Sequence, residues 1–279
     1  MNMRHVLIRL FALLLWLPAA WAGQVYTISV VPQFTPVDIG TRWSPLLARL
    51  EKDTGINLQL RVLEHIPKFE ADFLAGLPDF VYLNPWHEVM AMKAQGYRPL
   101  VRGSDPLNGI LVVDRQGPIK RLADLSGKTL AFPSPNAFGA SLYMRALLKE
   151  KEGVDFTPTY VGTHQNVYRH VLLGEAAAGG GIATTLEKEP AAVQARLTVL
   201  YTTPGVPSHP LAAHPRVPAD IRERLTTALL QLDRTPEGRK LLQAVELDRT
   251  LAVDYARDYA PLEKLNLGSY TKNPKAGGK

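Results

Sequence analysis

Apolar and polar positions alternate between strand-like and helix-like patterns from about residue 25 to residue 205. Short apolar runs predict strands at 25–31, 58–63, 79–83, 109–113, 129–132 and 198–203. Apolar positions at helical spacing predict helices from Ser44-Pro45 to Gly55 and at 85–95, 118–125, 139–149 and 165–173. This alternation favours a parallel or mixed α/β sheet. After Pro204 the pattern predicts helices at 219–232 and 236–244, with no new sheet.

The first 22 residues have the three parts of a secretory signal peptide. Arg4 and Arg9 give a basic start, an apolar stretch runs from 10 to 21, and Ala20-Trp21-Ala22 is a small-x-small cleavage site. The alternative is an N-terminal membrane anchor, but this apolar stretch is shorter than the about 20 residues that a membrane-spanning helix needs. We therefore predict cleavage after Ala22 and a soluble protein in the periplasm.

The charge of the chain argues against a nucleic-acid partner. The formal net charge is +6, but part of it lies in the signal peptide and in the tail 268–279, whose Gly, Lys and Pro content predicts disorder. The rest is nearly neutral and has no basic run with interleaved aromatic residues. The chain has no cysteine, which excludes disulfides and thiolate metal sites.

One segment has the form of an anion-binding turn. Residues 130–142, Leu-Ala-Phe-Pro-Ser-Pro-Asn-Ala-Phe-Gly-Ala-Ser-Leu, predict a short strand, a polar turn and the start of a helix. The first N–H groups of a helix have no partner within it, and the helix dipole adds partial positive charge there. An oxyanion is therefore favoured without any charged side chain. Strand-to-helix turns are common to all α/β proteins, so this segment alone does not define a site.

Four segments carry a resemblance to a known family. They are Ile28-Ser-Val-Val-Pro32, residues 119–132 with Leu-Ser-Gly-Lys-Thr, residues 162–174, and residues 230–242 with Thr-Pro-Glu-Gly. Together they are similar to the phosphate/phosphite/phosphonate-binding family of periplasmic solute receptors that serve ABC transporters. The resemblance covers nearly the whole mature chain.

The resemblance implies a two-lobed α/β fold, the type II-like periplasmic binding protein fold, with two hinge crossovers and a ligand cleft. We expect lobe 1 at 23–105 plus 205–267 and lobe 2 at 106–204. The crossovers are expected near 104–108 and 201–205, where Pro and Gly occur in or beside extended residues. Closure of the lobes around the ligand would be the signal that a membrane partner reads.

The same resemblance implies a set of ligand contacts, centred on the turn Ser134–Gly139 and on His164. The full expected set is Phe34, Thr35, Tyr82, Asn84, Ser134, Asn136, Ala137, Phe138, Gly139, His164, Thr184 and Ser208. Two of these have open alternatives. Tyr82 is equally interpretable as a packing residue beside Trp86, and His164 as a helix-capping or surface histidine.

The chain departs from the family at the head of the anion-binding helix. The family has consecutive Ser and Thr hydroxyls there, whereas this chain has Asn136-Ala137-Phe138, so we expect a smaller or more apolar pocket. On the far side of the cleft, 181–185 and 207–210 contain no acid. Because an ammonium buried without an anionic partner is costly, we predict that aminoalkyl phosphonates are not favoured.

Three functions remain open. The leading prediction is a monomeric extracytoplasmic binding protein that captures a small oxyanion or phosphonate-like ligand for the membrane permease of an ABC transporter. The second is a ligand-sensing partner of the periplasmic domain of a histidine kinase, and the third an exported enzyme on the same scaffold. No hydrolase motif is present, and His164 and His170 would point to different faces of a helix. No catalytic residue, metal or cofactor is therefore expected.

Overall fold

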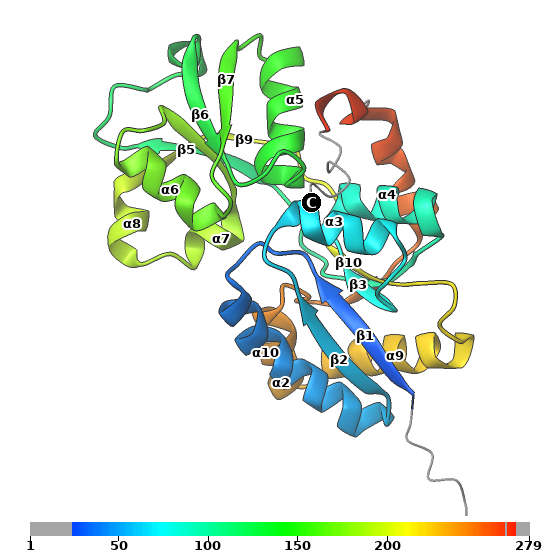
Figure 1. Ribbon diagram of the computed structural model, residues 1–279. Helices are drawn as coiled ribbons and strands as arrows, with labels where there is room; N and C mark the ends of the chain where they lie inside the picture. The colour runs from blue at the N-terminus through cyan, green and yellow to red at the C-terminus, as the bar shows by residue number, and fades with distance from the viewer. Residues whose placement is uncertain (1–23, 266, 272–279) are drawn as a thin grey trace, which may run out of the picture.

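The computed structural model describes residues 24–265 and 267–271. The predicted signal peptide, its cleavage site and residues 272–279 lie outside this part of the chain. The described residues form two α/β lobes, one above the other in Figure 1. This arrangement confirms the predicted fold class. We keep the names lobe 1 and lobe 2 for the parts that carry the two sheets; their exact limits stay predictions.

Lobe 1 contains a mixed sheet with the strand order β11-β4-β10-β3-β1-β2. Strand β1 is parallel to β2 and β3, whereas β10 is antiparallel to β3 and β4. The strands are β1 (Val25–Val30), β2 (Asn57–Val62), β3 (Phe80–Tyr82), β4 (Arg98–Arg102), β10 (Pro210–Ala213) and β11 (Leu251–Ala252). The helices are α2 (Pro36–Thr54), α3 (Ile66–Leu74), α4 (Pro85–Gln95), α9 (Ala219–Leu232), α10 (Pro236–Ala244) and α11 (Tyr255–Asp258), followed by the 3₁₀ helix η3 (Ala260–Leu265).

Lobe 2 contains a second mixed sheet, with the order β7-β6-β8-β5-β9. Its strands are β5 (Gly109–Asp114), β6 (Lys128–Phe132), β7 (Phe156–Tyr160), β8 (Ala178–Ile182) and β9 (Leu197–Thr202). Its helical segments are η1 (Leu122–Leu125), the π-helical turn η2 (Phe138–Leu142), α5 (Tyr143–Glu150), α6 (His164–Leu172), α7 (Ala183–Glu187) and α8 (Ala191–Arg196).

Several elements differ from the sequence prediction. A sheet strand does follow Pro204, because β10 inserts between β3 and β4 in the middle of the lobe 1 sheet. The first helix begins at Thr35-Pro36 rather than at Ser44-Pro45, since the Thr35 hydroxyl caps it by accepting from the Asp38 N–H. Residues 118–121 are not helical.

The C-terminal segment also differs from its prediction. Gly268–Tyr270, expected in a disordered tail, belong to the 3₁₀ helix η4 (Leu267–Tyr270), which packs on α5 of lobe 2. The Arg145 guanidinium donates to the Tyr270 carbonyl at 2.8 Å. The segment thus passes from lobe 1 to lobe 2 and ends against a helix of the second lobe.

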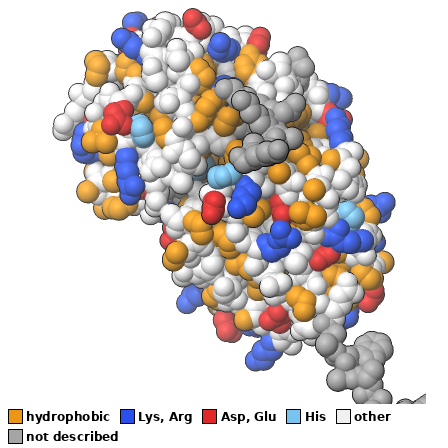
Figure 2. Space-filling model, viewed as in Figure 1, with side chains coloured by type: hydrophobic (Ala, Val, Ile, Leu, Met, Phe, Trp, Pro, Cys, Tyr) orange, Lys and Arg blue, Asp and Glu red, His pale blue; other side chains and the backbone are white. Residues whose placement is uncertain are grey.

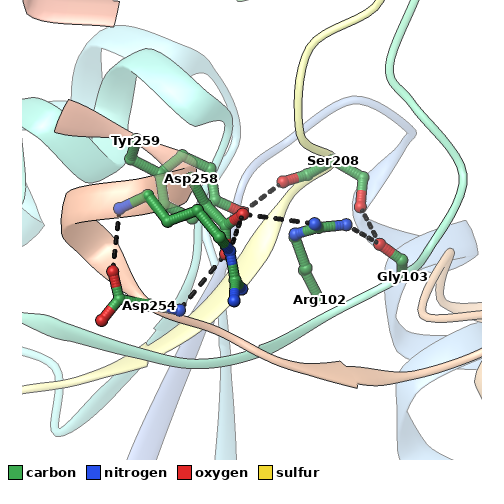
Figure 3. Close-up of polar contacts among 7 residues, drawn as sticks. Arg102, Gly103, Ser208, Asp254, Asp258 and Tyr259 are labelled. Carbon is green, nitrogen blue, oxygen red and sulfur yellow. Dashed lines mark hydrogen bonds and ion pairs between the residues drawn. The ribbon is translucent and has the colours of Figure 1, made fainter. Parts of the chain in front are cut away.

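The two crossovers, residues 103–108 and 203–208, are tied to each other. Leu107 and Val206 form an antiparallel bridge, with N–H···O distances of 2.8 and 3.1 Å. The Ser208 hydroxyl donates to the Gly103 carbonyl at 2.7 Å, and the Tyr259 hydroxyl donates to the Ser208 carbonyl at 2.6 Å (Figure 3). Arg102, which also donates to the Gly103 carbonyl, pairs with Asp258. The C-terminal segment therefore supports the hinge. The hydroxyl of Ser208, a predicted ligand residue, makes its hydrogen bond within the hinge.

Candidate ligand-binding site

A small buried cavity lies between the lobes. The volume open to the centre of a water-sized sphere is about 10 Å³. This is about the volume that one buried water molecule needs. It is lined by Val31, Gln33, Ile66, Asn84, Leu107, Ala137, Phe138, Gly139, Ala140, His164, Ile182 and His209. None of these side chains is a carboxylate, an ammonium or a guanidinium. The lobes are therefore closed around a site made of neutral groups.

Several helices begin at this cavity. Ile66 is the first residue of α3, Asn84 is the N-cap of α4, Ala137 is the N-cap of η2, and His164 is the first residue of α6. The first turn of each helix has N–H groups without an intrahelical acceptor, and each dipole adds partial positive charge. The site can therefore stabilise an anion without a charged side chain of its own.

The turn before α5 lies directly on the lobe 2 sheet because two strand residues are glycine. A Cβ atom on Gly180 would lie 1.9 Å from the Ala140 carbonyl oxygen, and one on Gly109 would lie 2.1 Å from the Gly139 carbonyl oxygen. The N–H groups of Ser141 and Leu142 both donate to the Ala137 carbonyl, which closes the π-helical turn. A side chain at position 109 or 180 would push the proposed anion-binding turn away from the sheet.

A buried guanidinium supports the same turn from behind. Arg145 on α5 donates to the Pro135 carbonyl at 2.7 Å and to the Ser141 hydroxyl at 3.1 Å. Burial lowers the pKa of Arg145 from its usual value, but arginine stays protonated in proteins. Its positive charge thus lies behind the proposed anion-binding turn, although Arg145 does not line the cavity. The sequence prediction missed this residue.

Asn84 connects the two lobes at the cavity. Its side-chain oxygen accepts from the His87 N–H at 2.7 Å and caps α4, while its Nδ2 donates to the Asn136 carbonyl of lobe 2 at 3.2 Å. The His87 ring is in turn held by Glu70 at 2.9 Å in the core of lobe 1. Asn84 is therefore fixed on its own lobe and reaches across the cleft.

Two histidines face each other across the interlobe cavity, one from each lobe. Burial lowers the pKa of both His164 and His209 to about 4, so both rings are neutral at pH 7. The Nδ1 atom of His164 lies 3.2 Å from the Thr185 hydroxyl, so Nε2 is the ring nitrogen that could contact a ligand. The Nε2 atom of His209 lies 2.9 Å from Nε2 of Gln33. His164 is thus a cavity residue, and not a surface histidine.

The structure brings part of the predicted site together. Asn84, Ala137, Phe138, Gly139 and His164 line the cavity. Ser134 and Asn136 are buried in the same turn, at 6% and 2% exposure.

The other predicted residues lie elsewhere. Phe34 and Tyr82 line a separate small hollow within lobe 1. Tyr82 packs against Trp43 and His209, and its hydroxyl donates to the Glu246 carbonyl at 3.4 Å. Thr35 is the N-cap of α2.

Thr184 and Ser208 line an adjoining hollow of about 310 Å³. Carboxylates also line this hollow, from Asp105, Glu187, Glu246 and Asp248. The two stretches compared in the sequence contain no acid, but these four come from other segments. The cavity itself has none.

The sequence also missed several cavity residues. Gln33 directly precedes the predicted Phe34, and His209 directly follows the predicted Ser208. In both loops the prediction was therefore one residue away. The apolar residues Val31, Ile66, Leu107 and Ile182 carry no signal that separates them from ordinary core positions, although Ile182 follows the unusual run Gly179-Gly180-Gly181.

Comparison with known proteins identifies the family. The family model described as "ABC transporter, phosphonate, periplasmic substrate-binding protein" matches residues 28–259. The chain belongs to this family. Its members are solute-binding proteins of transporters, which confirms the prediction of a binding protein.

Individual relatives are distant in sequence. The chain is 23% identical over 188 residues to the phosphate-import protein PhnD of Mycolicibacterium smegmatis, covering 59% of this chain and 57% of the relative. It therefore spans a little over half the length of that protein. Two solved structures show the same fold. PhnD1 of Prochlorococcus marinus in complex with methylphosphonate has a TM-score of 0.79 at 16% identity, over 88% of this chain and 98% of that one. A binding protein component of an ABC phosphonate transporter from Pseudomonas aeruginosa has a TM-score of 0.78 at 13% identity, over 91% and 90%.

Two further features concern only the described residues. Within 24–265 and 267–271, no three or more His, Asp or Glu residues are grouped so that they could hold a metal ion. In the same part of the chain, no helix has the length and apolar character needed to cross a bilayer.

Proposed function

We propose that this protein captures a small phosphonate or a related oxyanion between its lobes and presents the closed form to the membrane permease of an ABC transporter. The observation that carries this proposal is the convergence of α3, α4, η2 and α6 on one buried cavity lined by neutral groups. Such a site favours negative charge and offers amide, imidazole and backbone N–H donors.

Capture would proceed in two steps. In the open form the anion would meet the start of η2 and His164 on lobe 2. Closure would then bring Gln33, Asn84 and His209 from lobe 1 against it. Because closure excludes water, each hydrogen bond to the anion becomes stronger than it would be in an open groove.

The dimensions of the cavity favour a small ligand. The closed cavity has about 10 Å³ for the centre of a water-sized sphere, so the lobes must part before a tetrahedral oxyanion can enter. Phe138 narrows the lobe 2 side and stacks on Tyr143 at 5.5 Å between ring centroids. Phosphate, phosphite and methylphosphonate are therefore preferred candidates over phosphonates with long substituents.

The cellular setting follows from the family. Its members are periplasmic, and we propose that export uses the N-terminal segment with cleavage after Ala22. We further propose that the protein acts as a monomer. Family membership favours delivery to a permease over docking on a sensor kinase.

The test is calorimetric titration of the mature protein with phosphate, phosphite, methylphosphonate, 2-aminoethylphosphonate and sulfate. We expect selective binding of one of the first three and weak binding of the amine. A ligand at about a hundredfold its dissociation constant should add about 2.7 kcal/mol to the free energy of unfolding. The bound compound should be recovered chemically unchanged. If none of the five anions binds or stabilises the protein, the proposal is wrong.

A further inference from the structure

An ion pair joins the two lobes outside the cavity. Lys188, which directly follows α7 of lobe 2, places its Nζ 2.7 Å from Oε1 of Glu246, which lies just beyond α10 of lobe 1. The side chains are 28% and 14% exposed. Both residues line the adjoining hollow, and neither lines the cavity. The pair therefore spans the cleft without contacting the anion site.

Lys188 has a second partner on lobe 1. Its Nζ lies 4.9 Å from the centre of the Phe34 ring, and the Arg42 guanidinium lies 4.5 Å from the same centre. A cation over an aromatic face is attracted by the ring quadrupole. This contact gives Phe34, one of the predicted ligand residues, a place in the lobe contact instead of in the cavity.

The backbone at Glu246 is unusual for a residue with a side chain. The N–H of Leu247 donates to the Leu242 carbonyl and the N–H of Glu246 to the Gln243 carbonyl, which is the Schellman pattern at the end of α10. The central residue of this pattern is usually glycine, because φ is positive there. Here φ of Glu246 is 64°. The chain thus keeps a strained glutamate where glycine would be relaxed, which indicates that the carboxylate itself is needed.

The surroundings of the carboxylate keep it ionised. Burial alone would raise the pKa of Glu246, but the charge of Lys188, with the His209 ring and hydrogen bonds from Lys188 and Thr184, lowers it below the usual value. Lys188 and Thr184 belong to lobe 2, whereas His209 belongs to lobe 1. Most of this stabilisation is therefore present only while the lobes are together.

We propose that Lys188 and Glu246 form the latch of the closed cleft, an ion pair that sets how long the closed form lasts without touching the ligand. This inference rests on the proposed binding function. An interaction present in one state only shifts the equilibrium toward that state. Loss of the pair should therefore speed ligand dissociation and leave association almost unchanged.

The experiment uses the absence of native cysteines. One spin label is attached to Val37→Cys in lobe 1 and the other to Leu173→Cys in lobe 2, where the native residues are 77% and 71% exposed. Double electron–electron resonance between the two labels measures the separation of the lobes. The closed fraction is measured with and without methylphosphonate, inorganic phosphate and phosphite. Dissociation rates come from stopped-flow displacement. Lys188→Met and Glu246→Gly should lower the closed fraction and speed dissociation roughly two- to fivefold, while Lys188→Arg should keep both at the parental values.

Glu246→Gly separates a latch from a purely structural role. Because glycine relaxes the positive φ, its melting temperature should equal or exceed that of the parent protein while closure weakens. Arg249→Gly is the matched control. Arg249 also has a positive φ, 50°, and an ion pair, but its partner Asp105 lies in the first crossover and not in lobe 2. Arg249→Gly should leave the closed fraction unchanged.

The latch and the proposed function can fail separately. If the parent protein binds none of the three anions, the proposed ligand class is wrong, and the ligand-free closed fraction still tests the latch. The latch is overturned if Lys188→Met and Glu246→Gly keep the parental closed fraction and dissociation rate. It is also overturned if the parent shows no closed population under any condition.

Discussion

Replacing Asn84 by aspartate tests whether the anion lies between α4 and the η2 turn. Asp and Asn are equally good N-caps, so Asn84→Asp should keep α4 folded. The substitution removes the Nδ2 donor that reaches the Asn136 carbonyl at 3.2 Å. It also places a carboxylate among the cavity-lining residues, at a position 2% exposed.

The expected loss of binding has two parts. The lost cross-lobe hydrogen bond contributes about 1 kcal/mol. A buried carboxylate beside an anion must be repelled or protonated, which adds at least a similar amount. We therefore expect affinity to fall by at least about 2 kcal/mol, or about 30-fold, at pH 7. The defect should shrink toward acid pH as the new carboxyl group takes up a proton.

Calorimetric titration between pH 5 and pH 8 measures this effect with whichever anion the parent protein binds. Thr235→Asp is the matched control, because Thr235 is the exposed N-cap of α10 and does not line the cavity. It should leave affinity unchanged at every pH. Parental affinity in Asn84→Asp would refute the placement of the anion. A loss of affinity that does not depend on pH would refute the electrostatic reasoning.

Four further predictions concern single positions. Gly180→Ala should lower the free energy of unfolding by about 2 kcal/mol or more in urea titration, because its Cβ would lie 1.9 Å from the Ala140 carbonyl oxygen. Gly40→Ala, in open space on α2, should instead raise it by up to about 1 kcal/mol. Burial raises the pKa of Glu88 well above 4.5, so the folded state keeps a proton that the unfolded chain releases. Stability should then fall as pH rises above about 4.5, by up to about 1.4 kcal/mol per pH unit, and urea titration of Glu88→Gln should lack this slope. Asn136→Asp should weaken anion binding by more than about 1.4 kcal/mol, or tenfold, in calorimetry, and unchanged affinity would place the anion elsewhere.

Local signals predicted those elements whose ends are set by nearby residues. The helices 85–95, 219–232 and 236–244 have the predicted bounds, since Pro and Gly mark their ends or an apolar face marks their length. The first helix was predicted nine residues late because Ser44-Pro45 resembles a helix start. In the structure the Ser44 hydroxyl donates to the Gly40 carbonyl within α2, and Thr35 is the cap.

Tertiary contacts decide the remaining elements. Strand β8 contains Gly179-Gly180-Gly181, which has no strand propensity. It is a strand because η2 lies against Gly180, while the α6 residues Val167 and Tyr168 lie against Gly179 and Gly181. Strand β10 is short, and only its neighbours β3 and β4 define it. The same limit applies to the site, because His209 and Gln33 become ligand candidates only once the lobes meet.

Recognition and closure use different chemistry in this protein. The cavity offers neutral donors and helix dipoles, so the charge of the ligand is the charge that closure buries. The full charges that face each other across the cleft, Lys188 and Glu246, lie at its partly exposed rim. Mixed charges also cover the visible face of both lobes in Figure 2, without a large region of one sign. An ion pair that keeps some solvent contact is worth at most about 1 kcal/mol. It therefore shifts the closed fraction of the empty protein only modestly, and it lengthens the lifetime of the filled form by up to about fivefold. Such a division lets a receptor hold an anion firmly and still open when a partner competes for the rim.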